Sequence, residues 1–266
     1  MPTTESADGD SDQLFVLTAV LLTPAQFPSV LGDDYPEVCA DLGLEPYAEG
    51  YGLVLGQDGN GARWTVATED VSLVACAIAA WDCGMDYDLS PGENSIVGAL
   101  PGWPVALAVS APEVPEPHDP EPQDGDPAPL APPDAEGWGP AQRRLGADEI
   151  ALQWAAWREQ VDDEEAFAEP GESGGEGAHQ GVRRVLEEAR GYLTQPPPPG
   201  RVRSSFAAGE ARTLRVDGPG WSMVARTDDI AFVLLDEEPG EVHPVGRGPE
   251  LPGLLASLDE LAVRPS

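Results

Sequence analysis

The stretch WSMVARTDDIAFVLLDEEPGEVHPV (Trp221–Val245) carries the strongest signal for the fold. Two apolar segments, 221–226 and 230–236, read as strands and are joined by RTDDI. Asp favours such turns because its side chain accepts hydrogen bonds from nearby backbone amides. DEEPGE follows as a second turn that contains Pro-Gly, and 242–245 reads as a further short strand. We therefore predict an antiparallel β-meander with acidic turns.

The flanking sequence extends this meander into a C-terminal α+β domain over 137–266, with a flexible insert at 162–178. Two more strands are expected at 202–206 and 212–217, after the helix-stopping PPPPG. Apolar residues at helical spacing predict three helices: 147–161, 179–194 and 250–261. Strands in one run with helices around them favour an antiparallel sheet with the helices on one face.

An N-terminal α+β domain is expected over 13–110, after a disordered acidic arm at 1–12. QDGNG predicts a hairpin, because Asp-Gly and Asn-Gly tolerate a positive φ. Its strands and the other elements of this domain are expected over five ranges: strands 13–23, 52–56, 62–68 and 104–110, and a buried helix at 71–81. The acids just before that helix suit a helix N-terminus.

Residues 111–136 separate the two domains in this interpretation. They hold nine Pro and eight acidic residues with no basic residue. Such a composition predicts an extended, polyproline-like linker with a reach of roughly 80 Å at ~3.1 Å per residue. The fold class predicted from the sequence is thus two small α+β domains joined by an acidic, Pro-rich linker.

The charge of the chain is strongly negative, with 48 acidic against 14 basic residues and a net charge of -34. Residues 1–142 contain 25 of the acids and one Arg. Such a field repels nucleic-acid phosphates and anionic lipid and attracts basic surfaces. An alternative interpretation needs no partner: the negative charge serves solubility or adaptation to a salty cytoplasm. We predict a basic protein partner, with no direct binding of nucleic acid.

No apolar run is long enough to span a membrane, and the segment at 14–22 lacks the positive flank of a secretory signal. The three cysteines, Cys39, Cys76 and Cys83, form no CxxC pair and read as buried reduced thiols. These features predict a cytoplasmic protein without a membrane segment.

A search for catalytic motifs predicts no catalytic residue, no cofactor and no metal. GxSxG is absent, and a chain without Lys cannot form a GxxxxGK[ST] phosphate loop. The three histidines fall in separate places: His118 in the linker, His179 at a helix start and His243 in a strand. No cluster of Cys and His at zinc-binding spacing occurs.

These observations predict a non-catalytic interaction module for a basic protein, such as an immunity protein, an inhibitor or a dedicated chaperone. The candidate partner-binding residues are the acids of the two meander turns: Asp228, Asp229, Asp236, Glu237, Glu238 and Glu241. One alternative is a metal-assisted enzyme that uses these carboxylates with Arg226 or Arg247. Another is a nucleic-acid mimic that occupies a DNA-binding protein.

The segments TEDVSLV (68–74) and TDDIAFV (227–233) match in residue type at every position. They represent either an internal duplication or two uses of common turn chemistry. A helix after the first segment and a strand after the second would exclude duplication.

Overall fold

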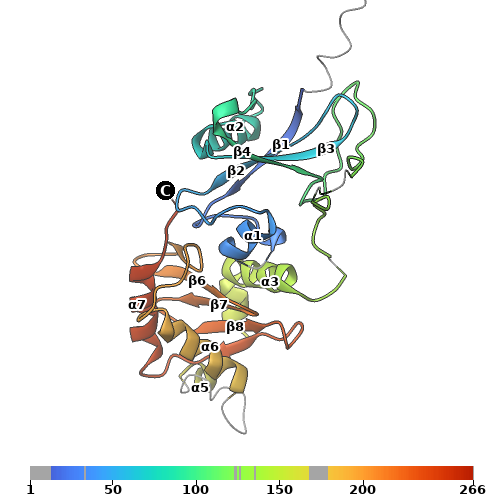
Figure 1. Ribbon diagram of the computed structural model, residues 1–266. Coiled ribbons are helices and arrows are strands. Elements are labelled where there is room, and N and C mark those ends of the chain that lie inside the picture. The colour runs from blue at the N-terminus through green and yellow to red at the C-terminus, as the bar shows by residue number, and fades with distance from the viewer. Residues whose placement is uncertain are drawn as a thin grey trace, which may run out of the picture. The chain divides into compact units, whose positions relative to one another are not determined.

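The computed structural model describes residues 13–32, 34–122, 125, 127–134, 136–167 and 179–265 (Figure 1). The chain divides into two compact units. Unit 1 comprises 1–23 and 47–133, and unit 2 comprises 24–46 and 134–266. Both units combine helices with an antiparallel sheet, so the fold is mixed α+β. No helix among the described residues is long and apolar enough to cross a bilayer.

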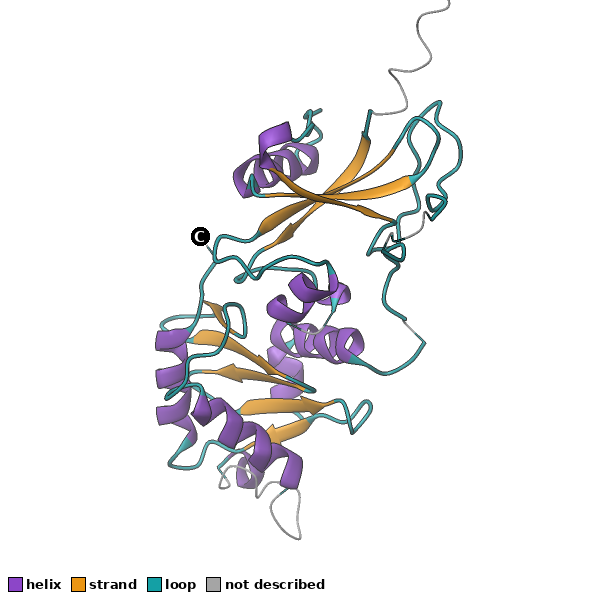
Figure 2. Cartoon of the chain, viewed as in Figure 1, coloured by secondary structure: helices purple, strands orange, loops and turns teal. Residues whose placement is uncertain are grey.

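Unit 1 contains a four-stranded antiparallel sheet with the strand order β1-β2-β3-β4 (Figure 2). Its strands are β1 (Phe15–Leu22), β2 (Tyr51–Gln57), β3 (Arg63–Thr68) and β4 (Ile96–Pro101). The predicted hairpin is confirmed, since the Asp58 carboxylate accepts hydrogen bonds from the backbone of Asn60 and Ala62 in the turn between β2 and β3. The predicted helix is α2 (Val71–Asp82), and the Asp70 carboxylate caps its first turn.

Two expectations for the first half of the chain are wrong. Residues 104–110 form no strand, because β4 takes the place beside β3 and Pro104 lacks the N–H that a ladder requires. Of the three cysteines only Cys39 is buried, whereas Cys76 and Cys83 are exposed. Burial raises the pKa of the Cys39 thiol to about 11.

The Pro-rich segment up to residue 133 belongs to unit 1, and a separate linker between two domains is not confirmed. The Gln57 side chain binds it twice, accepting from the amide of Ala111 at 2.7 Å and donating to the carbonyl of Pro115 at 3.1 Å. Further along, the Leu130 amide donates to the Pro101 carbonyl at 2.7 Å. Proline lacks an N–H but keeps its carbonyl as an acceptor, so the segment is held both by its remaining amides, which donate to Gln57 and Pro101, and by its carbonyls, one of which accepts from Gln57.

Unit 2 contains the predicted meander as a five-stranded antiparallel sheet with the order β5-β6-β7-β8-β9. Its strands are β5 (Val202–Phe206), β6 (Arg212–Gly218), β7 (Trp221–Arg226), β8 (Ala231–Leu235) and β9 (His243–Val245). The RTDDI and DEEPGE segments form the turns on either side of β8, as the sequence predicts.

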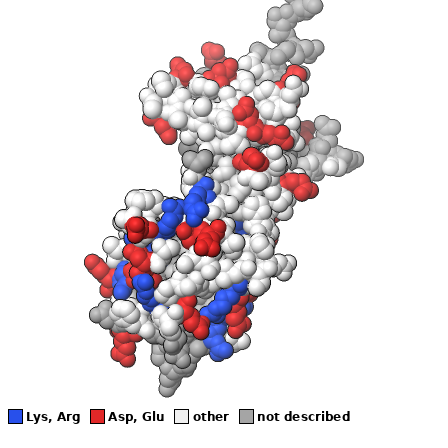
Figure 3. Space-filling model, turned by 90° about the vertical axis from the view of Figure 1, so that its left-hand side faces the viewer, with Lys and Arg blue, Asp and Glu red and all other residues white. Residues whose placement is uncertain are grey.

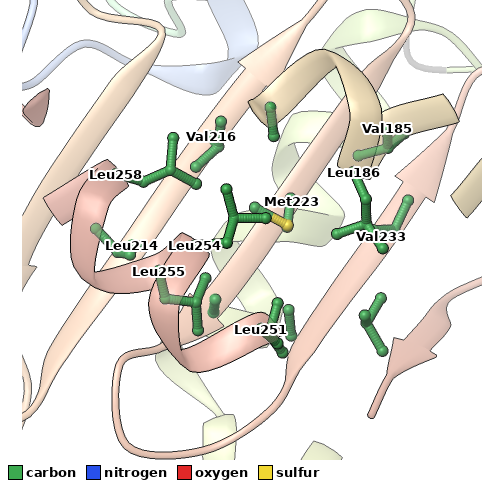
Figure 4. Close-up of a cluster of buried hydrophobic side chains, with 14 of the residues drawn as sticks. Val185, Leu186, Leu214, Val216, Met223, Val233, Leu251, Leu254, Leu255 and Leu258 are labelled. Atoms are coloured by element: carbon green, nitrogen blue, oxygen red, sulfur yellow. The ribbon is translucent and has the colours of Figure 1, made fainter. Parts of the chain in front are cut away.

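Helices cover both faces of this sheet, so the expectation of helices on one face is wrong. One face packs against α6 (Gln180–Gly191) and α7 (Leu251–Leu261), and the other packs against α3 (Pro140–Leu152) and α4 (Trp154–Arg158). All five residues of β8 are buried, which a strand with one wet face would not allow. The first face is filled by aliphatic side chains (Figure 4): Val185, Leu186, Leu214, Val216, Met223, Val233, Leu251, Leu254, Leu255 and Leu258.

The helix predicted at 147–161 is two helices that meet at Gln153. It also starts earlier, at Pro140, whose missing N–H is tolerated in a first turn. Its apolar stripe does pack into the core as expected, with the Trp154 and Phe232 ring centroids 5.3 Å apart. The shorter helices are α1 (Tyr35–Asp41), α5 (Asp163–Ala166) and the 3-10 helices Ser29–Leu31 and Glu93–Ser95.

The duplication hypothesis is wrong, because TEDVSLV leads into α2 whereas TDDIAFV leads into β8. The match reflects two acidic turns with different roles, since Asp70 caps α2 whereas the Asp229 carboxylate accepts from Arg158 and Trp154. The predicted disordered arm at 1–12 and most of the predicted flexible insert, 168–178, lie outside the described residues.

A buried network of charges lies between α3 and the sheet of unit 2. The fully buried carboxylate of Asp217 is 3.1 Å from Nη1 of Arg144 and 3.2 Å from Nη2 of Arg203. Its other oxygen accepts a hydrogen bond from Ser222 at 2.6 Å. Phe27, from the 24–46 segment, lies against both guanidinium groups, with ring-centroid distances of 4.5 and 4.8 Å. Asp217 is thus the central counterion of this network.

The surroundings of Asp217 set its protonation. Burial alone would raise the pKa of Asp217, but Arg144, Arg203, Arg215 and the hydrogen bond from Ser222 hold that pKa well below its usual range. Burial and the neighbouring Arg144 lower the pKa of Arg203, and Asp217 opposes this shift. The neighbouring arginines and Ser222 therefore favour the ionised form of the Asp217 carboxylate in the fold.

Substituting Asp217→Asn is expected to lower the free energy of unfolding by about 3–5 kcal/mol, because buried guanidinium groups lose their counterion. Urea unfolding followed by tryptophan fluorescence measures this loss. Glu237→Gln, which removes half of an exposed ion pair with Arg184, serves as the control and should cost less than about 1 kcal/mol. Equal losses in the two variants would show that Asp217 is not central.

Asp217 also gives the fold a defined acid sensitivity. Its pKa in the folded state lies below the value of about 3.9 in an unfolded chain, so its contribution is complete above pH 4 and is lost as the pH falls. We expect the stability gap between wild type and Asp217→Asn to narrow by about 1.4 kcal/mol per pH unit below about pH 4. Unfolding curves recorded from pH 6 downward test this, and a constant gap would contradict it.

Candidate functional site

The six predicted acidic residues do not meet in one site. Asp228 and Asp229 lie in the turn before β8, while Asp236, Glu237, Glu238 and Glu241 follow its last residue. The two groups therefore lie at opposite ends of a five-residue strand, roughly 16 Å apart at about 3.3 Å per residue.

Two of these carboxylates hold the domain together. Asp229 accepts hydrogen bonds from Nε of Arg158 at 3.0 Å and from the indole of Trp154 at 3.3 Å, and so ties α4 to the turn. Asp236 forms a 2.7 Å ion pair with the fully buried Arg143 of α3. Their geometry indicates a structural role.

The remaining predicted residues differ in their surroundings. Glu237 pairs with Arg184 at 2.6 Å, and Glu238 contacts His179 and His243. Asp228, with a side chain that is 60% exposed, lies 3.6 Å from Arg226, and Glu241 is exposed. The charge of these turns is therefore largely balanced by neighbours within unit 2.

The balance of charge differs between the two units. Unit 2 holds 30 acidic and 13 basic residues, and unit 1 holds 18 and one, so each carries -17. Within the described residues, eleven of the 13 Arg of unit 2 form ion pairs with carboxylates of the same unit. In unit 1, Arg63 is already paired with Asp119 at 2.5 Å. Figure 3 shows one face of unit 1 with acidic side chains and no basic one in view.

Unit 1 also contains a groove beside its acidic surface. Seven consecutive residues, Gln13–Ala19, form one wall, and the C-terminal turn of α2 with the loop at 86–90 forms the other. Its volume is about 830 Å³. The apolar floor includes Ala19 and Leu89, which belong to the core between α2 and the sheet.

The groove is negative because of three carboxylates and a helix end. Asp82, Asp86 and Asp88 line it and are exposed. The last turn of α2 carries no basic residue, so its partial negative charge adds to that of Asp82. Among the described residues, no cation pairs with any of these three carboxylates.

The wall formed by β1 exposes backbone hydrogen-bonding groups. β1 is the terminal strand of the sheet and pairs only with β2 on its inner side. Within the part of the chain that the structure describes, no strand or bridge pairs with its outer edge. Such an edge is a template for an added strand. The sequence predicted this strand, but its position at the sheet edge depends on pairings that residue patterns do not give.

Sequence reasoning missed a second cluster, in unit 2. His179 at the N-cap of α6, Glu238 after β8 and His243 at the start of β9 lie together, with donor atoms within 4.8 Å of one another. The two imidazole rings stack, with centroids 4.2 Å apart. Each histidine was assigned correctly to its element, but the two meet because the start of α6 lies against the turn between β8 and β9, which residue patterns do not give.

Comparison with known proteins gives no match to any family model, curated protein or solved structure.

The structural role of Asp229 gives a prediction that separates it from its neighbour. Asp229→Ala should lower the free energy of unfolding by about 1–3 kcal/mol, because Arg158 and the Trp154 indole lose their acceptor. Asp228→Ala, in the same turn, should stay within about 0.5 kcal/mol. Urea unfolding of both variants measures the difference. An equally small loss of stability in the two variants would show that Asp229 has no structural role.

Proposed function

We propose that the chain is a non-catalytic interaction module and that the groove of unit 1 binds an extended, basic segment of a partner protein. The observation that carries the proposal is the unpaired outer edge of β1 along a groove lined by Asp82, Asp86 and Asp88. An inhibitor, an immunity protein or a dedicated chaperone could each use such a groove. The acidic turns of unit 2 become secondary in this proposal, because intramolecular contacts already balance most of their charge.

Strand addition explains how one groove supplies both affinity and selectivity. A peptide that pairs with the β1 edge makes backbone hydrogen bonds whatever its sequence, and its alternate side chains point to the two faces of the sheet. Side chains on the α2 side meet the three carboxylates and the rings of Trp81 and Tyr87. Arg and Lys satisfy the carboxylates and also interact favourably with aromatic faces.

The proposal is tested with a fluorescent peptide of alternating Arg and Val, measured by anisotropy against the full chain. Binding should weaken as the screening length falls from about 30 Å at about 0.01 M salt to about 8 Å at about 0.15 M. N-methylation of alternate residues blocks the backbone pairing, and one of the two methylated registers should abolish binding. A peptide with Glu in place of Arg should not bind.

A matched pair of triple variants locates the surface. Asp82→Asn, Asp86→Asn and Asp88→Asn together should weaken binding by about tenfold or more, since three facing charges are lost. The control removes the same charge from exposed positions elsewhere in unit 1: Glu49→Gln, Glu69→Gln and Glu93→Gln. Equal weakening in both would mean that only net charge matters, and the groove would be rejected.

A further inference from the structure

We propose that His179, Glu238 and His243 of unit 2 form a binding site for one divalent transition-metal ion, with Zn²⁺ as the best-fitting probe. The three residues are the one group of three or more His, Cys, Asp or Glu donors that converges among the described residues. The inference does not depend on peptide binding by unit 1.

The fold brings the three donors together from separate elements. Nε2 of His179 lies 3.2 Å from Oε1 of Glu238, and Nε2 of His243 lies 2.5 Å from its Oε2. The carboxylate thus faces both rings. Gly181 allows this arrangement, because a Cβ there would lie 2.4 Å from Leu235 and 3.2 Å from the His179 ring.

The chemistry of the donors suits Zn²⁺. Two imidazole nitrogens and one carboxylate oxygen form a recurring ligand set for this ion, with a fourth position left for solvent. Bond lengths of about 2.0–2.2 Å place neighbouring tetrahedral ligands roughly 3.3 Å apart. The His179–Glu238 separation already fits. The His243–Glu238 separation must widen by less than about 1 Å, and a rotation of the turn carboxylate supplies this.

Two of the donor atoms lack a satisfactory partner. Nε2 of His243 and Oε2 of Glu238 are buried and close, but neither forms a hydrogen bond of acceptable geometry with any described residue. Buried polar atoms are normally satisfied, so this pair calls for an explanation. A metal ion bound by both atoms provides one.

A hollow of about 740 Å³ beside the cluster gives access to the open coordination position. His179 and Glu238 line it together with the polar side of α6. Arg183 and Arg184 also line it, and Arg184 is held by Glu237 at 2.6 Å. In the described chain Glu238 forms ion pairs only with the two histidines, so an ion that enters from the hollow displaces no arginine from this carboxylate.

His179 also has a structural role that competes with metal binding. Its Nδ1 accepts a hydrogen bond from the amide of Val182 at 3.3 Å and so caps α6. A neutral ring in this tautomer carries its proton on Nε2 and donates it to Glu238. Metal binding at Nε2 moves that proton to Nδ1 and breaks the cap. The test must therefore separate loss of the cap from loss of a ligand.

The experiment titrates the metal-free full chain with Zn²⁺, and with Co²⁺ as a spectroscopic probe. Millimolar Ca²⁺ is present throughout to occupy sites made only of carboxylates. We expect one equivalent of Zn²⁺ to bind, a rise in the melting temperature, and a Co²⁺ spectrum typical of nitrogen and oxygen ligands. Absence of saturable Zn²⁺ binding would overturn the proposal.

Three variants remove the ligands one at a time. His179→Asn keeps a good helix cap while removing the imidazole. Glu238→Gln removes the carboxylate charge, and His243→Phe keeps a ring for stacking. Each should weaken Zn²⁺ binding by about a hundredfold or more while the metal-free protein stays folded by circular dichroism.

His118→Asn is the matched control, because it removes the third histidine of the chain from unit 1. It should leave Zn²⁺ affinity and the Co²⁺ spectrum unchanged. If His179→Asn and His243→Phe bind Zn²⁺ as wild type does, the cluster is only a capping and stacking contact, and the proposal is overturned.

Discussion

The buried carboxylate of Asp217 is the constraint on which unit 2 depends. Arg144 and Arg203 are taken out of water between α3 and the sheet, and removing such charges from water costs free energy unless counterions accompany them. In the part of the chain that the structure describes, Asp217 is the fully buried carboxylate that contacts both. Phe27 lies against the same two guanidinium groups, so the 24–46 segment completes the network.

This arrangement divides the roles of charge between the two units. In unit 2 nearly every arginine is held by a carboxylate of that unit, and the negative turns of the meander take part in this balance. Unit 1 has one arginine, Arg63, and it forms an ion pair with Asp119. No other acid among the described residues of unit 1 forms an ion pair with an arginine. The basic partner that we propose would therefore gain most where the chain itself offers no competing positive charge.

Local patterns predicted most elements. Apolar runs gave β5, β7 and α2, and the turn residues QDGNG and RTDDI gave the hairpins that they close. These patterns failed where tertiary structure decides. The continuous apolar run of β8 indicates a strand covered on both faces, but the prediction placed all the helices on one face of the sheet. No local signal joins 24–46 to Asp217, because that association depends on contacts between residues far apart in the chain. The edge position of β1 and the meeting of His179 with His243 also depend on such pairings.

The same reasoning changes what an acidic residue means in this chain. With 48 carboxylates, adjacency in sequence carries little information, and only the surroundings separate one acid from another. Asp217 is a counterion, Asp229 an acceptor that joins two elements, and Asp86 a charge without an internal partner in the described chain. We seek function at carboxylates of the last type, such as Asp86, because a partner that binds them does not have to break an ion pair or hydrogen bond within the fold.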